Sequence, residues 1–187
     1  MLIGSLAPDE GGYLGFVVGY FDFSCPYSYA MSERLRGAED RLEWRLVEHA
    51  PDARVPMGGE ADPRELEDVR RAAPEVELNR PPGLPSSGLA SRVFAGLAPE
   101  RRMRFLHLVF RALWVDGRDI SSREVIEQLA EGHVSPATTR WQADWTALGI
   151  GVPALLRDDG ARCLGIVPAD DLRGFLAGQG HDLQGAY

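Results

Sequence analysis

The sequence predicts an α/β fold in which two halves of a small sheet are separated by a helical block. Residues 16–50 show the pattern strand, helix, strand, and residues 150–178 show the pattern strand, strand, helix. Between them, residues 63–149 carry helical patterns and no strand pattern. We therefore expect one domain built from residues 16–50 and 150–178, an inserted helical domain at residues 63–149, and a loose leader at residues 1–14.

The first unit begins with an apolar run at residues 16–23, which is typical of a buried strand. Pro26 follows, and proline suits the first turn of a helix, where its missing N–H costs nothing. Gly37 marks the end of that helix near residue 38. Residues 43–49 partly alternate polar and apolar side chains, which predicts a second strand. A strand–helix–strand crossover of this length joins parallel neighbours.

The helical block contains several start and stop signals. Ser121 and Glu124 have capping-box spacing, which predicts the start of a helix that ends at Gly132. Ser135-Pro136 predicts the start of the next helix, which ends at Gly149. The remaining predicted helices span residues 63–73, 87–95 and 99–115.

The second unit starts with a short apolar strand at residues 152–157. A turn at residues 158–161 connects it to a partner strand at residues 162–166, and an amphipathic helix follows at residues 168–177. We expect the tail from Gly178 to fray. A β-α-β half followed by a β-β-α half is the arrangement of the thioredoxin fold, split here by the helical insertion.

Composition excludes several kinds of function. The chain has 187 residues and a net charge of -8, which argues against a nucleic-acid partner. All 20 basic residues are arginine, so lysine chemistry is excluded. Two cysteines make no disulfide framework, and neither they nor His49 and His107 have metal-ligand spacing. With no signal-peptide pattern and no membrane-spanning run, we expect a cytoplasmic protein with no membrane partner.

Cys25 is the candidate catalytic residue. It lies between the first strand and the helix that begins with Pro26. A helix N-terminus offers partial positive charge and free N–H groups, so this position should favour thiolate over thiol. The alternative is a small buried cysteine at a strand end. Asp22 would influence the Cys25 pKa if it is buried, and a simple polar group at the strand end is the other interpretation.

Val152 and Pro153 are predicted to lie beside Cys25, because the first and third strands of a thioredoxin-type sheet are neighbours. Proline at a strand start is compatible with a cis peptide bond, although a trans proline at a strand start is the alternative. A cis bond would turn the Val152 backbone toward an extended peptide or a thiol tripeptide. Pro26, Tyr27, Val152 and Pro153 therefore form the predicted substrate-binding or thiol-binding site.

Four stretches carry a resemblance to a known family. They are FDFSCPYSY (residues 21–29), LPSSGLASR (84–92), FRALWVDGRDIS (110–121) and GIGVP (149–153), with Gly165 downstream. Over about residues 17–177 the chain resembles the DsbA-like branch of the thioredoxin superfamily. More narrowly, it is similar to the group of FrnE-type oxidoreductases, 2-hydroxychromene-2-carboxylate isomerases and kappa-class glutathione transferases.

The resemblance implies an enzyme that acts through Cys25 and Ser28. Oxidoreductases of the group resemble Cys-Pro-x-Cys at the active site, whereas the isomerases and kappa transferases resemble Ser-Pro-Tyr. This chain has Cys25-Pro26-Tyr27-Ser28, which keeps the nucleophile and places serine where a resolving cysteine would lie. The leading interpretation is a monothiol DsbA/FrnE-like thiol–disulfide oxidoreductase. Cys163 is expected in the core, at the far end of the sheet from Pro153 and beyond disulfide reach.

Two other functions stay open at this stage. Ser28 and its Pro-Tyr-Ser-Tyr context also resemble a glutathione-dependent isomerase or transferase, in which the thiolate of glutathione does the chemistry. The missing second thiol also fits a non-catalytic thioredoxin-fold binding protein. We expect no tightly bound cofactor and no metal, with glutathione as a possible co-substrate that resolves a mixed disulfide. The substrate would be a protein disulfide or a small thiol, and a homodimer is possible.

Overall fold

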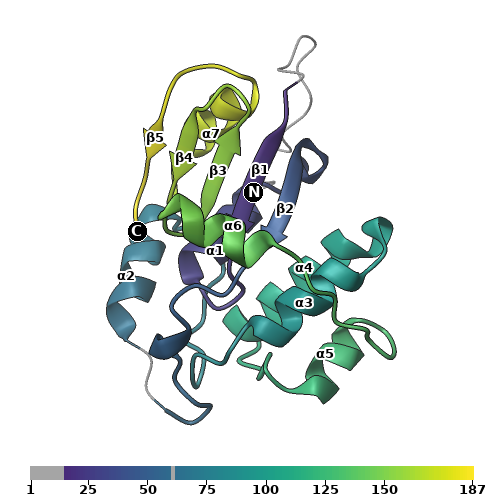
Figure 1. Cartoon of the computed structure of the whole chain (residues 1–187). Helices are drawn as coiled ribbons and strands as arrows, with labels where there is room; N and C mark the ends of the chain where they lie inside the picture. Colours follow the sequence, from purple (N-terminus) through teal and green to yellow (C-terminus); the bar gives the residue numbers. More distant parts are fainter. Residues whose placement is uncertain (1–14, 60–61) are drawn as a thin grey trace.

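The computed structural model describes residues 15–59 and 62–187, so the predicted leader at residues 1–14 lies outside the described residues. Five strands form one mixed sheet in the order β2-β1-β3-β4-β5 (Figure 1). The pairs β1–β2 and β4–β5 are parallel, and β1–β3 and β3–β4 are antiparallel. The α/β class and the thioredoxin arrangement are confirmed. The strands are β1 (Val17–Phe21), β2 (Leu42–Leu46), β3 (Ala154–Arg157), β4 (Arg162–Leu164) and β5 (Leu183–Gln184).

The helices connect the strands in the predicted order. One helix joins β1 to β2, five lie between β2 and β3 in the chain, and one follows β4. Figure 1 shows α3, α4 and α5 grouped together, with α2 on the other side of the view, near the chain's C-terminus. The α-helices of the described residues are α1 (Pro26–Arg34), α2 (Pro63–Ala72), α3 (Gly88–Gly96), α4 (Pro99–Trp114), α5 (Arg123–Leu129), α6 (Trp141–Leu148) and α7 (Ala169–Leu176). Among them, no helix has the length and apolar character that a bilayer span requires.

Two predicted helix starts are wrong. The N-cap of α5 is Ser122, whose hydroxyl accepts from the Val125 N–H, whereas the Ser121 hydroxyl donates to Asp119. The helix expected from residue 135 begins only at Trp141. The intervening chain is held against α3 instead, because the Ala137 N–H donates to the Arg92 carbonyl at 2.9 Å.

The prediction of a frayed tail is also wrong. Leu183 pairs with Cys163 of β4, and Ala186 forms an antiparallel bridge with Ile166. The two backbone hydrogen bonds of that bridge are 2.9 and 3.1 Å long. Gly185 makes this close approach possible, because a Cβ there would lie 2.0 Å from the Ile166 carbonyl oxygen. The tail is therefore hydrogen-bonded to the edge of the sheet.

An aromatic core holds the end of β1 in place. Phe23 is fully buried, and its ring packs edge-on against Phe110 of α4 with centroids 5.0 Å apart. The indole N–H of Trp114 donates to the Phe23 carbonyl at 2.8 Å. Burying one such side chain contributes roughly 1.5–3 kcal/mol. The residues just before Cys25 are thus fixed by both hydrophobic packing and a hydrogen bond.

Candidate active site

Cys25 is the N-cap residue of α1, as the sequence predicts. Its N–H donates to the Asp22 carbonyl at 3.1 Å, and its carbonyl accepts from the Tyr29 N–H at 3.1 Å. The cysteine backbone is extended, with φ -106° and ψ 119°, and Pro26 supplies the first helical residue. This geometry turns the sulfur toward the free N–H groups of the first turn of α1.

The loop before β3 completes the other side of the site. The Val152–Pro153 peptide bond is cis, in agreement with the prediction. Tyr20 of β1 pairs with Ala154 of β3, and the Cys25 thiol donates to the Val152 carbonyl at 3.6 Å. Residues 127 positions apart in the sequence are thereby brought into direct contact. Val152 and Pro153 are both buried at this contact.

Burial dominates the acidity of Cys25. The residue is 8% exposed, and desolvation is the largest influence on its thiol. It raises the pKa of Cys25 to about 12, with a further rise from the negative charge of Asp22. The N–H and hydroxyl of Ser28 and the N–H of Tyr27 act in the opposite direction. The thiolate expected from the helix terminus alone is therefore not favoured in this conformation, because desolvation outweighs the helix N–H groups.

Ser28 lies one turn into α1, directly behind Cys25. It is fully buried, and its hydroxyl accepts from the Asp22 N–H at 3.2 Å. The same hydroxyl hydrogen-bonds to the Cys25 sulfur, and this hydrogen bond lowers the pKa of the thiol. Ser28 thus offers a hydrogen bond to the Cys25 sulfur.

Pro26 lines a small cavity next to Cys25. The cavity has a volume of about 310 Å³, and its walls include Val55, Leu84 and Trp114. Glu65 supplies a carboxylate to the lining. Tyr27 is 6% exposed, and burial followed by the charges of Asp68 and Glu65 raises its pKa to about 12. An apolar group of a bound molecule has a place here, next to Pro26, the first residue of α1.

Asp22 is a site residue whose role could not be decided from the sequence. It is fully buried and accepts from the N–H groups of Ser24 at 2.8 Å and His49 at 2.7 Å. Arg54 pairs with it at 2.8 Å and also donates to the His49 carbonyl at 2.7 Å. The carboxylate therefore joins the turn before Cys25 to the chain that follows β2. No sequence pattern marks Arg54, because the loop that carries it has no regular spacing.

Cys163 does not lie where it was predicted. It faces Leu155 across the β3–β4 ladder, only two residues along β3 from Pro153, so it is not at the far end of the sheet. The register places it there, because Leu156 rather than Arg157 pairs with Arg162. The core position is confirmed: Cys163 is fully buried, and desolvation raises its pKa to about 12. Both cysteines are free.

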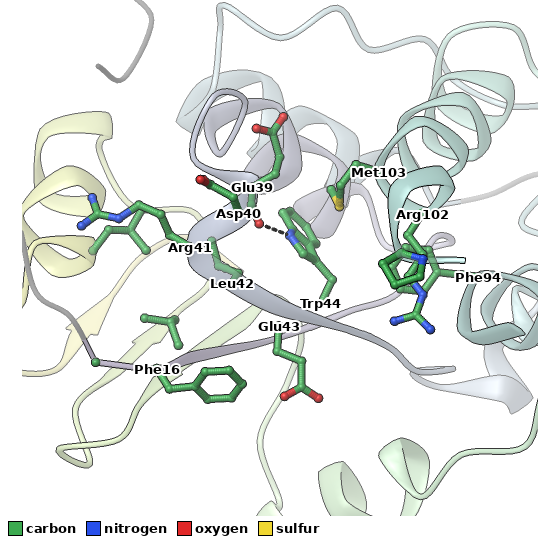
Figure 2. A pocket seen from close by; sticks show the side chains of 14 residues that line it. Phe16, Glu39, Asp40, Arg41, Leu42, Glu43, Trp44, Phe94, Arg102 and Met103 are labelled. Atoms are coloured by element: carbon green, nitrogen blue, oxygen red, sulfur yellow. Dashed lines mark hydrogen bonds between the residues drawn. The ribbon is translucent and has the colours of Figure 1, made fainter. Parts of the chain in front are cut away.

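A large cavity lies away from Cys25. Figure 2 shows it beside the starts of β1 and β2, with Phe16, Trp44, Phe94 and Met103 around it. Its volume is about 640 Å³, and it contains none of the predicted site residues. Because Cys25 follows the opposite end of β1, this cavity is not part of the thiol site.

The two histidines that the sequence singled out have structural contacts. His49 packs edge-on against Trp145 with ring centroids 5.8 Å apart, and His107 contacts Glu39 at 3.2 Å. Burial lowers the pKa of His107, so the ring is favoured in its neutral form. Within residues 15–59 and 62–187, no group of three metal-ligating side chains comes together.

Comparisons with known proteins agree with this geometry. The family model described as DSBA-like thioredoxin domain matches residues 16–133. No curated protein sequence matches the chain. Among solved structures, a probable DsbA oxidoreductase from Streptomyces coelicolor superposes with a TM-score of 0.64 and 19% identity, covering 87% of this chain and 88% of that one.

Two further solved structures share the fold. A cytosolic disulfide reductase, DsbM from Pseudomonas aeruginosa, solved with GSH, gives a TM-score of 0.59 at 18% identity, over 86% of this chain and 96% of that one. A 2-hydroxychromene-2-carboxylate isomerase gives 0.55 at 22% identity, over 84% of this chain and 90% of that one. Identities this low establish the common fold and leave the reaction to be argued from the site.

Proposed function

Because the chain belongs to the DSBA-like thioredoxin domain family, we propose that it is a thiol–disulfide oxidoreductase working through the single cysteine Cys25. One observation carries the proposal. Cys25 is placed at the first turn of α1 and in contact with the Val152 carbonyl, which puts one sulfur between helix N–H groups and a loop that can receive a substrate backbone.

The chemistry follows from having one sulfur. The Cys25 thiolate attacks a disulfide R–S–S–R′, the S–S bond breaks, R′–S⁻ leaves, and a Cys25–S–S–R mixed disulfide forms. Ser28 has no sulfur with which to resolve it, and Cys163 is fully buried. A second thiolate, R″–S⁻, must attack the mixed disulfide, releasing the Cys25 thiolate and R–S–S–R″. A small external thiol such as glutathione is the co-substrate we propose, and the reducing cytoplasm is the proposed location.

The test is to trap the intermediate. The protein is incubated with glutathione disulfide, and whole-protein mass spectrometry should show one added glutathione that dithiothreitol removes. Reduction of a peptide disulfide by glutathione should then be accelerated by the wild-type protein and by Cys163→Ala, and not by Cys25→Ser. If wild type and Cys25→Ser give the same rate, the proposal is wrong.

Two further measurements on the same variants distinguish the other two functions. Isomerisation of a hydroxychromene substrate that needs glutathione but forms no Cys25 adduct would indicate the isomerase reaction instead. Binding of a disulfide peptide without turnover would indicate a binding protein. Either result would replace the oxidoreductase proposal, because both remove the mixed disulfide from the mechanism.

A further inference from the structure

Residues 183–187 lie beside β4 and reach the loop that faces Cys25. We define the C-terminal strap as residues 183–187, which contain β5 and end at Tyr187. The strap is fastened to β4 through the Cys163–Leu183 pair and to the segment after β4 through the Ile166–Ala186 bridge. The Gly185 N–H also donates to the Leu164 carbonyl at 2.8 Å.

Tyr187 reaches from the strap to the loop that faces Cys25. A Cβ placed on Gly151 would lie 3.2 Å from Cε1 and 3.8 Å from Cδ1 of the Tyr187 ring, so the ring rests on the Gly151 backbone. Gly151 immediately precedes Val152, whose carbonyl accepts the hydrogen bond from Cys25. Tyr187 is 43% exposed, so the ring is only partly covered.

The acidity of Tyr187 responds to burial and to the charges of the two cysteines. Burial is the largest cause that raises the pKa of Tyr187 to about 12, and the charges that Cys163 and Cys25 would carry as thiolates are the next two. Because the strap pairs with β4 and the Tyr187 ring contacts Gly151, the ring lies between β4 and the loop that carries Val152 and Pro153.

We propose that the C-terminal strap gates Cys25, and that Tyr187 must leave Gly151 before a disulfide substrate reaches the thiol. The proposal rests on the oxidoreductase function proposed above, and it names the regulation of that same site. In the closed form the sulfur is covered and neutral. When the strap opens, water reaches Cys25 while the first-turn N–H groups of α1 stay in place, and the thiolate becomes accessible.

Two variants remove the Tyr187 ring from Gly151 by different means. Tyr187→Ala removes the ring and leaves the strap attached. Gly185→Ala keeps the ring but places a Cβ 2.0 Å from the Ile166 carbonyl oxygen, which forces the strap off that edge. Phe16→Ala is the matched control, because Phe16 is an exposed aromatic residue at the other end of β1 from the cysteine.

The readout is the rate of carbamidomethylation of each cysteine at pH 8, measured by mass spectrometry of tryptic peptides. Trypsin cleaves after Arg34 and Arg162, so Cys25 and Cys163 fall in separate peptides. Thiolate concentration rises tenfold for each unit by which the pKa of Cys25 falls, so both strap variants should raise the Cys25 rate at least tenfold over wild type. In Tyr187→Ala the Cys163 rate should stay at the wild-type value, because the Cys163–Leu183 pair is left in place. In Gly185→Ala the Cys163 rate can rise with the Cys25 rate, because that variant disturbs the edge of β4.

The gate is refuted if Tyr187→Ala, with Cys163 still protected, modifies Cys25 at the rate of wild type and Phe16→Ala. The measurement needs no turnover, so it is independent of the proposed reaction. Faster modification without any mixed disulfide with glutathione would keep the gate and reject the oxidoreductase. A mixed disulfide with unchanged modification rates would keep the oxidoreductase and reject the gate.

Discussion

Removal of the Arg54 side chain should destabilise the protein strongly, although Arg54 lies in a loop. In Arg54→Ala the Asp22 carboxylate, whose side chain is 1% exposed, loses its counter-charge. Breaking a buried ion pair by removing one partner costs about 3–5 kcal/mol. Two N–H donors, from Ser24 and His49, remain on the carboxylate, so we expect a loss at the lower end, about 3 kcal/mol.

Urea unfolding measured by circular dichroism is the assay, with the free energy of unfolding extrapolated to water. Arg71→Ala is the control, because Arg71 also pairs with an aspartate, Asp68, at 2.9 Å, yet its side chain is 76% exposed. Exposed pairs contribute at most about 1 kcal/mol. A double-mutant cycle of Asp22→Asn and Arg54→Ala isolates the pair, and the coupling energy should exceed about 1 kcal/mol. A loss below 1 kcal/mol for Arg54→Ala, or a coupling energy near zero, would contradict the assigned role.

Three further predictions concern the sulfurs. Because the pKa of Cys25 is raised to about 12, its modification rate in the wild-type protein should climb up to pH 10 without levelling, and a plateau near pH 8 would contradict the burial argument. Ser28→Cys should give a dithiol that resolves its own mixed disulfide, so peptide-disulfide reduction should proceed with one-turnover stoichiometry in the absence of glutathione. Cys25 and Cys163 each have a folded pKa near 12, above the unfolded value near 9, so the stability that they contribute is complete below pH 9 and lost between pH 9 and 12. The free energy of unfolding should fall by about 1.4 kcal/mol per pH unit for each cysteine, and Cys163→Ala should remove one of the two contributions.

Local patterns were sufficient to predict the elements that position the thiol. The Cys-Pro start of α1 and the apolar strand before it are encoded within a few adjacent residues, and both are confirmed. The cis bond at Val152–Pro153 could be predicted because the element order places that proline beside the cysteine. These features need only the pattern and the topology.

The remaining features depend on contacts that no pattern contains. Residues 134–139 do not form the expected helix start, because Ala137 bonds to the Arg92 carbonyl of α3. The tail pairs with β4 through Gly185, a residue type that in isolation indicates a loop. Arg54 meets Asp22 only after the loop following β2 has folded back. In each case tertiary packing decides the outcome over local propensity.

Two opposing effects set the acidity of Cys25: the helix N-terminus, which the sequence predicts, and desolvation, which comes from tertiary packing. A helix N-terminus typically stabilises a nearby negative charge by 0.3–1 kcal/mol, and by about 2 kcal/mol in favourable partly buried positions. A rise of the thiol pKa from 9.0 to about 12 corresponds to about 4 kcal/mol against the thiolate. Desolvation therefore exceeds the helix contribution, and no single hydrogen-bond donor could reverse it. Reactivity at Cys25 must come from a change in what covers the sulfur, and the proposed movement of Tyr187 away from Gly151 would supply that change.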